Sequence, residues 1–379
     1  MKIKKIDNPF IVSKSIPDEL FCDRKDETEV LKKQIYNGKN VVLVSPRRMG
    51  KTGLIHHLFR QSEIADNYYT FFIDIYAATS LREMCYVLGK EVFEKLKSRK
   101  TKMQELFFNT IKTLRVGFKI DSITGEPRFE MSIGAIEEPE TTLEEIINFL
   151  EKADKPCIVA IDEFQQIADF QEKRPEAVLR GLIQQCSNTS FIFSGSKQHS
   201  ISQMFNSKTR PFYQSAQMMD LKSLDKEVYS DFVLKLFKQY NKTIDKEVVE
   251  QVYDSFDGTT WYMQFVMNEL FAITPSKGRC KADDISKALS NIIDIQEGNY
   301  ASQMILLSSR QKQLLQAIAR EGTVKTVTSS AFVKKHSLDS ASSVQSALKG
   351  LNQKEIIATN EDGIYIQDYF FAYWLRKMY

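Results

Sequence analysis

Short apolar runs alternate with helical repeats along the first half of the chain. Four runs rich in β-branched or aromatic residues predict buried strands: Val41–Val44, Tyr69–Ala77, Cys157–Ile161 and Ser190–Phe193. Apolar residues at helical spacing lie between them, as in the set Leu54, Ile55, Leu58 and Phe59. This alternation predicts an α/β fold built on a parallel sheet.

Residues from about 100 to 140 interrupt the alternation. Two short strands are predicted there around a turn at Thr124 and Gly125, which indicates a hairpin insertion. Beyond Leu221 the apolar runs stop and helical repeats follow one another, so we predict a separate helical domain.

The chain from about Ser308 onward has a different pattern. Three helical segments are followed by two strands around Asp362 and Gly363, an order typical of a winged helix. We expect the domains to separate near Ser308.

Composition restricts the class of protein. The 379 residues, 42% of them hydrophobic, exceed the usual size of one core and predict two or three domains. No apolar run is long enough to span a bilayer and no signal peptide is evident, so we expect a cytoplasmic protein without a membrane partner. The five scattered cysteines are interpreted as thiols, and the net charge of +3 leaves nucleic-acid binding open.

The segment SPRRMGKT, Ser45–Thr52, follows the first strand and opens a helix. In that position backbone N–H groups and the positive helix end converge on phosphate, with Lys51 reaching the terminal phosphates and Thr52 binding Mg²⁺. We therefore predict a P-loop that binds ATP or ADP with Mg²⁺, and we expect the Lys51 charge to be exposed when the loop is empty. The residues assigned to nucleotide binding in this loop are Pro46, Arg47, Arg48, Met49, Gly50, Lys51, Thr52 and Gly53. Arg47 and Arg48 are expected to face a domain or partner.

Asp162 and Glu163 end the third strand, where parallel sheets bind ligands. Asp162 is predicted to bind Mg²⁺, and Glu163 to orient and deprotonate the water that attacks the γ-phosphate. The alternative is that these carboxylates cap a surface helix.

Two further residues are candidate catalytic groups. Ser194 directly follows the strand Ser190–Phe193, and its hydroxyl is expected near the γ-phosphate unless it forms a local turn. Arg210 is a candidate transition-state cation, acting within its own chain or on a neighbouring subunit, and the alternative is a solvated side chain.

Several segments together carry a family resemblance. They are NPF near the start, FCDRKDE, SPRRMGKT, CIVAIDEFQQI, FIFSGSKQ, RPFYQ and the closing DYFFAYWLR. They cover nearly the whole chain, which resembles the archaeal-type ATPases of the signal-transduction branch of AAA+ P-loop ATPases. The resemblance implies a P-loop ATPase core at 1–222, a helical lid at 223–300 and a winged helix at 301–379. It also implies that Pro9, Phe10 and the segment Asp23–Glu27, which contains Arg24, lie near the adenine.

Two positions depart from the pattern of that family. Ser45 stands where glycine is usual and restricts the backbone there, which bears on the hydrolysis rate. Thr260 stands where the lid commonly has proline, which bears on the coupling of nucleotide to lid movement.

Three functions remain open from the sequence. The leading hypothesis is an ATP-hydrolysing switch that moves the lid and winged helix, with an unknown protein partner and a possible homo-oligomer. The second is a nucleic-acid-binding regulator that uses the basic residues Lys334, Lys335, His336, Lys349 and Lys354 of the winged helix. The alternative for the winged helix is a protein-interaction or lid element. The third is a scaffold without turnover, which would require loss of the metal ligand or the base, and both are present.

Overall fold

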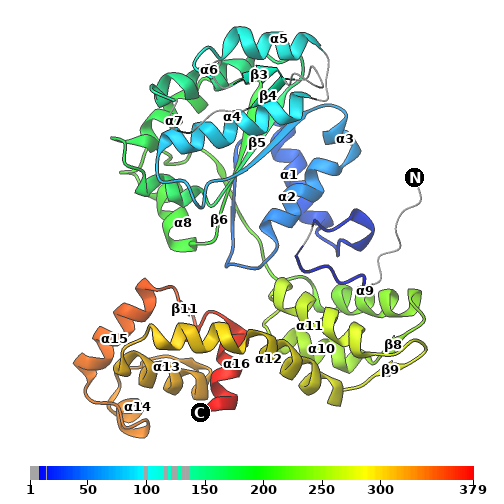
Figure 1. Ribbon diagram of the computed structural model, residues 1–379, viewed down its shortest axis with the longest axis vertical. Coiled ribbons are helices and arrows are strands. Elements are labelled where there is room, and N and C mark those ends of the chain that lie inside the picture. The colour runs from blue at the N-terminus through cyan, green and yellow to red at the C-terminus, as the bar shows by residue number, and fades with distance from the viewer. Residues whose placement is uncertain are drawn as a thin grey trace. The chain divides into compact units, whose positions relative to one another are not determined.

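The chain forms two compact units in the computed structural model (Figure 1). The structure describes residues 8–13, 15–97, 101–114, 118–120, 127–129, 133 and 136–379. One unit spans Ser15–Leu224, and the other contains Asp225–Tyr379 together with the N-terminal segment 8–13.

A parallel sheet of five strands forms the centre of the first unit. Its order is β2 (Tyr69–Asp74), β5 (Cys157–Asp162), β6 (Thr189–Gly195), β1 (Val41–Val44) and β7 (Gln217–Asp220). Every residue of β1 and β5 is buried, as expected of central strands covered on both faces. The predicted α/β class with a parallel sheet is confirmed.

Within this five-stranded sheet, β7 is the strand that the apolar pattern did not predict. Its sequence QMMD contains no apolar run, and no residue of this edge strand is fully buried. It forms because the chain returns to β1, where Val44 pairs with Asp220.

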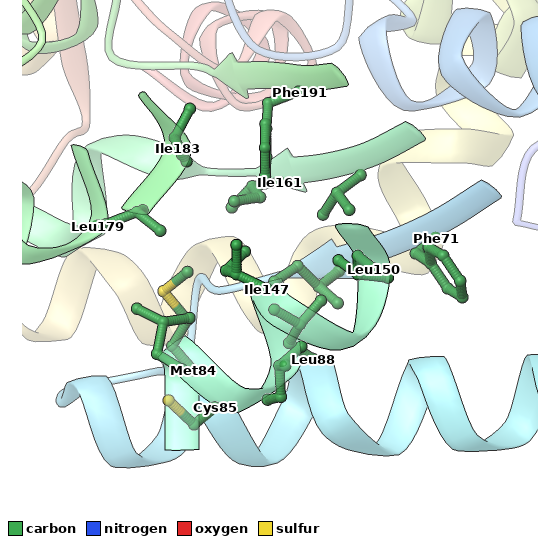
Figure 2. Close-up of a cluster of buried hydrophobic side chains, with 14 of the residues drawn as sticks. Phe71, Met84, Cys85, Leu88, Ile147, Leu150, Ile161, Leu179, Ile183 and Phe191 are labelled. Atoms are coloured by element: carbon green, nitrogen blue, oxygen red, sulfur yellow. The ribbon is translucent and has the colours of Figure 1, made fainter. Parts of the chain in front are cut away.

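Helices cover both faces of the sheet, and alternate residues of β1 enter two separate cores. Val42 and Val44 join a large cluster with residues of α4 (Leu81–Lys97) and α6 (Pro139–Glu151). Figure 2 shows part of this cluster, where Met84 and Leu88 of α4 lie beside Ile147 of α6. Val41 and Leu43 instead pack with residues of α1 (Lys25–Tyr36) and α2 (Lys51–Arg60).

The remaining elements of this unit connect the strands. They are the short helices η1 (Asp18–Leu20), α3 (Ser62–Ala65) and η4 (Phe164–Asp169), and the helices α7 (Pro175–Ile183) and α8 (Gln198–Asn206). The insertion contains α5 (Thr101–Thr110), which was not predicted, and the antiparallel pair β3 (Phe118–Ile120) and β4 (Pro127–Phe129). The pairing agrees with the predicted hairpin, whose turn at Thr124 and Gly125 lies outside the described residues.

The second unit begins with a helical region. It contains α9 (Lys226–Gln239), α10 (Lys246–Ser255), α11 (Thr260–Ile273) and α12 (Asp283–Ile305), with a small parallel pair of β8 (Thr243–Ile244) and β9 (Arg279–Cys280). Phe10 of the N-terminal segment is fully buried here, and its ring packs against Phe237 and Phe271. Thr260, the departure from the family pattern, is the first residue of α11.

The winged-helix arrangement follows in the same unit. Its helices are α13 (Ser309–Glu321), α14 (Ser330–Lys335), α15 (Ala341–Gln353) and α16 (Tyr369–Met378), and its sheet has the order β10 (Thr323–Val324), β12 (Gly363–Ile366), β11 (Ile357–Asn360). Gly363 has a φ of 137°, and a side chain there would meet the backbone oxygen of Val324 at 2.5 Å. The wing therefore requires glycine at this position.

Aromatic contacts cross the predicted 300/301 boundary. α12 runs through that boundary without interruption, and Tyr300 stacks on Phe371 of α16. Tyr262 of α11 packs against Tyr369 and Phe370. The helical region and the winged helix therefore share buried surface, and their separation near Ser308 stays a prediction.

Along the part of the chain that the structure describes, none of the helices combines the length and apolar character needed to cross a membrane.

Candidate functional site

Polar side chains gather where three neighbouring strands end. The strands β5, β6 and β1 are adjacent and parallel, so their carboxyl ends lie at one edge of the sheet. Asp162 is the last residue of β5, Ser194 lies near the end of β6, and Ser45 directly follows β1. This edge is where open parallel sheets bind ligands.

The loop after β1 turns sharply into α2. Gly50 has a φ of 90°, a left-handed conformation that glycine adopts without steric cost, and Arg48 has a φ of 69°. Gly50 is the N-cap of α2, and no side chain caps the helix. The first N–H groups of α2 and the positive end of its dipole are therefore suited to bind an anion.

Ser45 fits the position where the family has glycine. It is absent from the described residues with positive φ, so the backbone there does not require glycine. Its buried hydroxyl donates to the carbonyl of Pro46 and accepts a hydrogen bond from Lys51. Serine at position 45 has less backbone freedom than glycine, but its allowed conformations include the one that this loop adopts.

Lys51, the first residue of α2, folds back on its own loop. Its ammonium donates to the carbonyls of Ser45 at 3.0 Å and Pro46 at 3.1 Å. Only 7% of the residue is exposed, so the expectation of a solvent-exposed charge is wrong. Burial lowers the pKa of Lys51, although Asp162 and Glu163 oppose that shift.

Asp162 accepts hydrogen bonds from three segments of the chain. The hydroxyl of Thr52 donates to its Oδ2 at 2.7 Å, and the hydroxyl of Ser194 donates to its Oδ1. The N–H of Glu163 also donates to Oδ1, at 3.0 Å. Ser194 is fully buried, and its hydroxyl holds one oxygen of the Asp162 carboxylate.

The oxygens of Thr52 and Asp162 match the preference of Mg²⁺ for hydroxyl and carboxylate ligands. Among the described residues no group of three or more His, Cys, Asp or Glu side chains forms a protein-only metal site. Mg²⁺ beside a nucleotide takes one or two protein oxygens together with phosphate and water, so this small donor set fits the ion.

Glu163 stands at the N-cap of η4 in a left-handed conformation, with a φ of 54°. Its side chain makes no capping hydrogen bond, which disfavours the interpretation as a helix cap. Instead Oε2 accepts hydrogen bonds from Gln165 at 2.5 Å and from the hydroxyl of Ser196 at 2.8 Å. Sequence reasoning did not identify Gln165, because a glutamine after a strand carries no signal of its own.

Two arginines near the loop have different roles in the structure. Arg47 donates from Nε to the hydroxyl of Ser196 at 3.2 Å, which connects the loop to the group around Glu163. Arg24 is buried, and its guanidinium donates to the carbonyls of Met49 and Lys222 and pairs with Glu27. The guanidinium of Arg24 thus stabilises the loop that contains Met49.

The structure therefore brings Lys51, Thr52, Asp162, Glu163 and Ser194 together. It places Arg210 in an ion pair with Glu176 of α7. Burial raises the pKa of Glu176, and the Arg210 charge opposes that shift. Pro9 and Phe10 lie buried in the other unit, with Phe10 in its aromatic core.

Comparisons with known families identify two regions. Residues 21–266 match the family described as "ATPase domain predominantly from Archaea", and residues 298–377 match the one described as "Probable winged helix domain". A search of curated proteins found no match.

Several solved structures share the fold along nearly the whole chain. The Walker-type ATPase PABY2304 of Pyrococcus abyssi has a TM-score of 0.59 and 19% identity, over 97% of this chain and 99% of that one. The ORC2 protein of Aeropyrum pernix, solved as ADPNP-ADP complexes, has a TM-score of 0.59 and 14% identity, with 97% and 95% coverage. The ORC1 protein of Aeropyrum pernix in complex with DNA has a TM-score of 0.51 and 11% identity, with 97% and 95% coverage. At these identities the likeness is one of fold.

Proposed function

The chain belongs to the family of ATPase domains found predominantly in Archaea, and from this premise we propose that it binds ATP with Mg²⁺ and hydrolyses it as a nucleotide-dependent switch. The observation that carries the proposal is the meeting of Lys51, Thr52, Asp162 and Glu163 at one sheet edge. These groups supply the cation, metal ligands and base that hydrolysis of a phosphoanhydride requires.

Each residue of the site has a distinct role in the proposal. Lys51 exchanges its hydrogen bonds with the carbonyls of Ser45 and Pro46 for phosphate oxygens of ATP. Thr52 and Asp162 hold Mg²⁺, which when bound neutralises phosphate charge. Glu163 orients the attacking water and accepts its proton. Because Ser194 holds the carboxylate of Asp162, we assign it a positioning role.

The contacts of Arg24 support the switch. Its guanidinium links the carbonyl of Met49 in the loop to the carbonyl of Lys222, close to Leu224, where the first unit ends. A nucleotide that reshapes the loop would alter this link and with it the end of the first unit at Leu224, from which the chain continues into Asp225. Four expectations from the sequence stay predictions: membership of the signal-transduction branch, a protein partner, a homo-oligomer and a cytoplasmic location. A catalytic role for Arg210 also stays a prediction, and it would require release from Glu176.

Glu163→Gln tests the enzymatic part of the proposal. The variant keeps the size of the side chain but loses the basic carboxylate, so binding of a fluorescent ATP analogue should be retained. Phosphate release should fall about 10²- to 10⁴-fold, or roughly 3–5 kcal/mol in the barrier. Glu94→Gln, at an exposed position of α4, is the matched control. Equal turnover by the parent and Glu163→Gln would exclude the catalytic role.

Nucleic-acid binding through the winged helix is the second candidate. α15 contains no acidic residue and carries the exposed Lys349, with Lys354 just after it. Lys335 and His336 contribute less free charge, because both pair with Glu321. Binding to duplex DNA that weakens steeply with salt, and that falls in Lys349→Ala, would support this function. Salt-independent binding, or none, would exclude it.

A further inference from the structure

The side chain of Gln165 lies between Glu163 and Gly195. It is 4% exposed, and its Nε2 donates to Oε2 of Glu163. The orientation of the amide is determined by its partner, since a carboxylate accepts hydrogen bonds and the oxygen of the amide would repel it. Oε1 of Gln165 consequently points away from Glu163, and it is buried without a hydrogen-bond partner among the described residues.

Gly195 makes room for this amide. A Cβ atom at Gly195 would lie 2.2 Å from Oε1 of Gln165 and 2.9 Å from Cδ1 of Ile201. The φ of Gly195 is outside the left-handed region, so the backbone itself does not require glycine. The requirement comes from the close approach of Gln165.

The hydrogen bonds that the described residues donate to the Glu163 side chain reach one oxygen, Oε2. Gln165 and the hydroxyl and N–H of Ser196 donate to Oε2, and none of the described residues donates to Oε1. The hydrogen bonds from Gln165 and from the Ser196 hydroxyl come from different segments and restrict the rotation of the carboxylate.

We propose that Gln165 is a positioning residue that fixes the carboxylate of Glu163 toward the attacking water. The absence of a side chain at Gly195 leaves the space that the Gln165 amide occupies. This inference rests on the proposed ATPase function. A small displacement of a base relative to its water lowers the rate strongly, while the phosphate-binding loop is unaffected. The role of Gln165 should therefore be visible in kcat and not in ATP affinity.

Two independent substitutions test the proposal in the full-length protein. Gln165→Leu removes the donor, and Gly195→Ala displaces Gln165 without altering it. We expect kcat for phosphate release to fall about 10- to 100-fold in each, the range typical when the partner that orients a functional group is lost. The affinity for a fluorescent ATP analogue should stay within about twofold of the parent. Gln166→Leu is the matched control, because that amide donates to the backbone oxygen of Tyr76 and should leave kcat unchanged.

The same substitutions are then made in the Glu163→Gln background. If Gln165 acts through Glu163, Gln165→Leu should cause no further loss there, since effects of residues that act as a unit are not additive. An equal loss in both backgrounds, unchanged kcat in Gln165→Leu, or a fall in ATP affinity as large as the fall in rate would overturn the inference. Normal turnover by Glu163→Gln itself would instead refute the ATPase proposal, so the two failures are distinguishable.

Discussion

Thr52 and Asp162 are 110 positions apart in the chain, yet the hydroxyl of Thr52 donates a hydrogen bond of 2.7 Å to the carboxylate of Asp162. The threonine lies in the first turn of α2, and the aspartate ends β5. The pair joins the phosphate-binding loop to the strand that carries the proposed base. Both oxygens suit Mg²⁺, so this hydrogen bond marks where the ion would be held.

Thr52→Val should weaken the Mg²⁺ dependence of nucleotide binding, because valine has a similar shape but offers no oxygen. We expect the Mg²⁺ concentration for half-maximal binding of an ATP analogue to rise about 10-fold or more. Thr52→Ser keeps the hydroxyl and should behave like the parent. A Mg²⁺ titration monitored by analogue fluorescence checks this, and identical curves for parent and valine variant would argue against Thr52 as a ligand.

Lys51→Ala should abolish tight ATP binding while leaving the folded state intact. A hydrogen bond from a charged group is worth about 1.5–3 kcal/mol, so the affinity should fall roughly 10- to 100-fold. Burial lowers the pKa of Lys51, which means that the folded protein holds this charge at a cost. In the variant, relief of this cost opposes the loss of the hydrogen bonds to the carbonyls of Ser45 and Pro46, so the urea midpoint without nucleotide should stay close to that of the parent. Lys39→Ala, at an exposed position, is the control, and unchanged ATP affinity in Lys51→Ala would refute the assignment.

Arg24→Ala should destabilise the first unit and loosen the loop. The substitution leaves the carbonyls of Met49 and Lys222 without their donor and leaves Glu27 without its cation. Since Glu27 is partly solvated, we expect a loss of about 2–4 kcal/mol in the free energy of unfolding. Urea unfolding measures the loss, and Lys25→Ala, at an exposed position, should change stability little. A loss no larger than that of this control would show that the contacts of Arg24 contribute little.

Removal of residues 308–379 should destabilise the helical region that remains. The truncation uncovers Tyr262 and Tyr300, which α16 buries in the full-length chain. A buried aromatic side chain contributes about 2–3 kcal/mol, so the loss should be several kcal/mol. Limited proteolysis of α11 and α12 reports it, with a fragment of residues 15–224 as a control that keeps its own cores. Full protection of α11 and α12 in the truncated chain would favour a true boundary near Ser308.

The elements of the fold that the sequence predicted are those whose signal is local. Central strands such as β1 and β5 are apolar on both faces, and the loop residues Gly50 and Lys51 stand between a strand and a helix. The edge strand β7 and the helix α5 gave no comparable signal, since β7 depends on its pairing with β1. The pattern of apolar residues along the chain indicates which positions are buried, but it does not say which strands or helices bury them.

The candidate site divides in the same way. The sequence by itself determined which side chains are candidates for the chemistry, because Lys51, Thr52, Asp162 and Glu163 follow strands whose ends must meet in a parallel sheet. Only the tertiary structure decided that Lys51 is buried, that Ser194 supports Asp162 and that Gln165 reaches Glu163. The contact between Ser194 and Asp162 depends on β5 and β6 being neighbours, and the contacts of Lys51 and Gln165 depend on the backbone conformation of the loops that follow β1 and β5. The spacing of residues along one chain does not encode such contacts until the sheet has assembled.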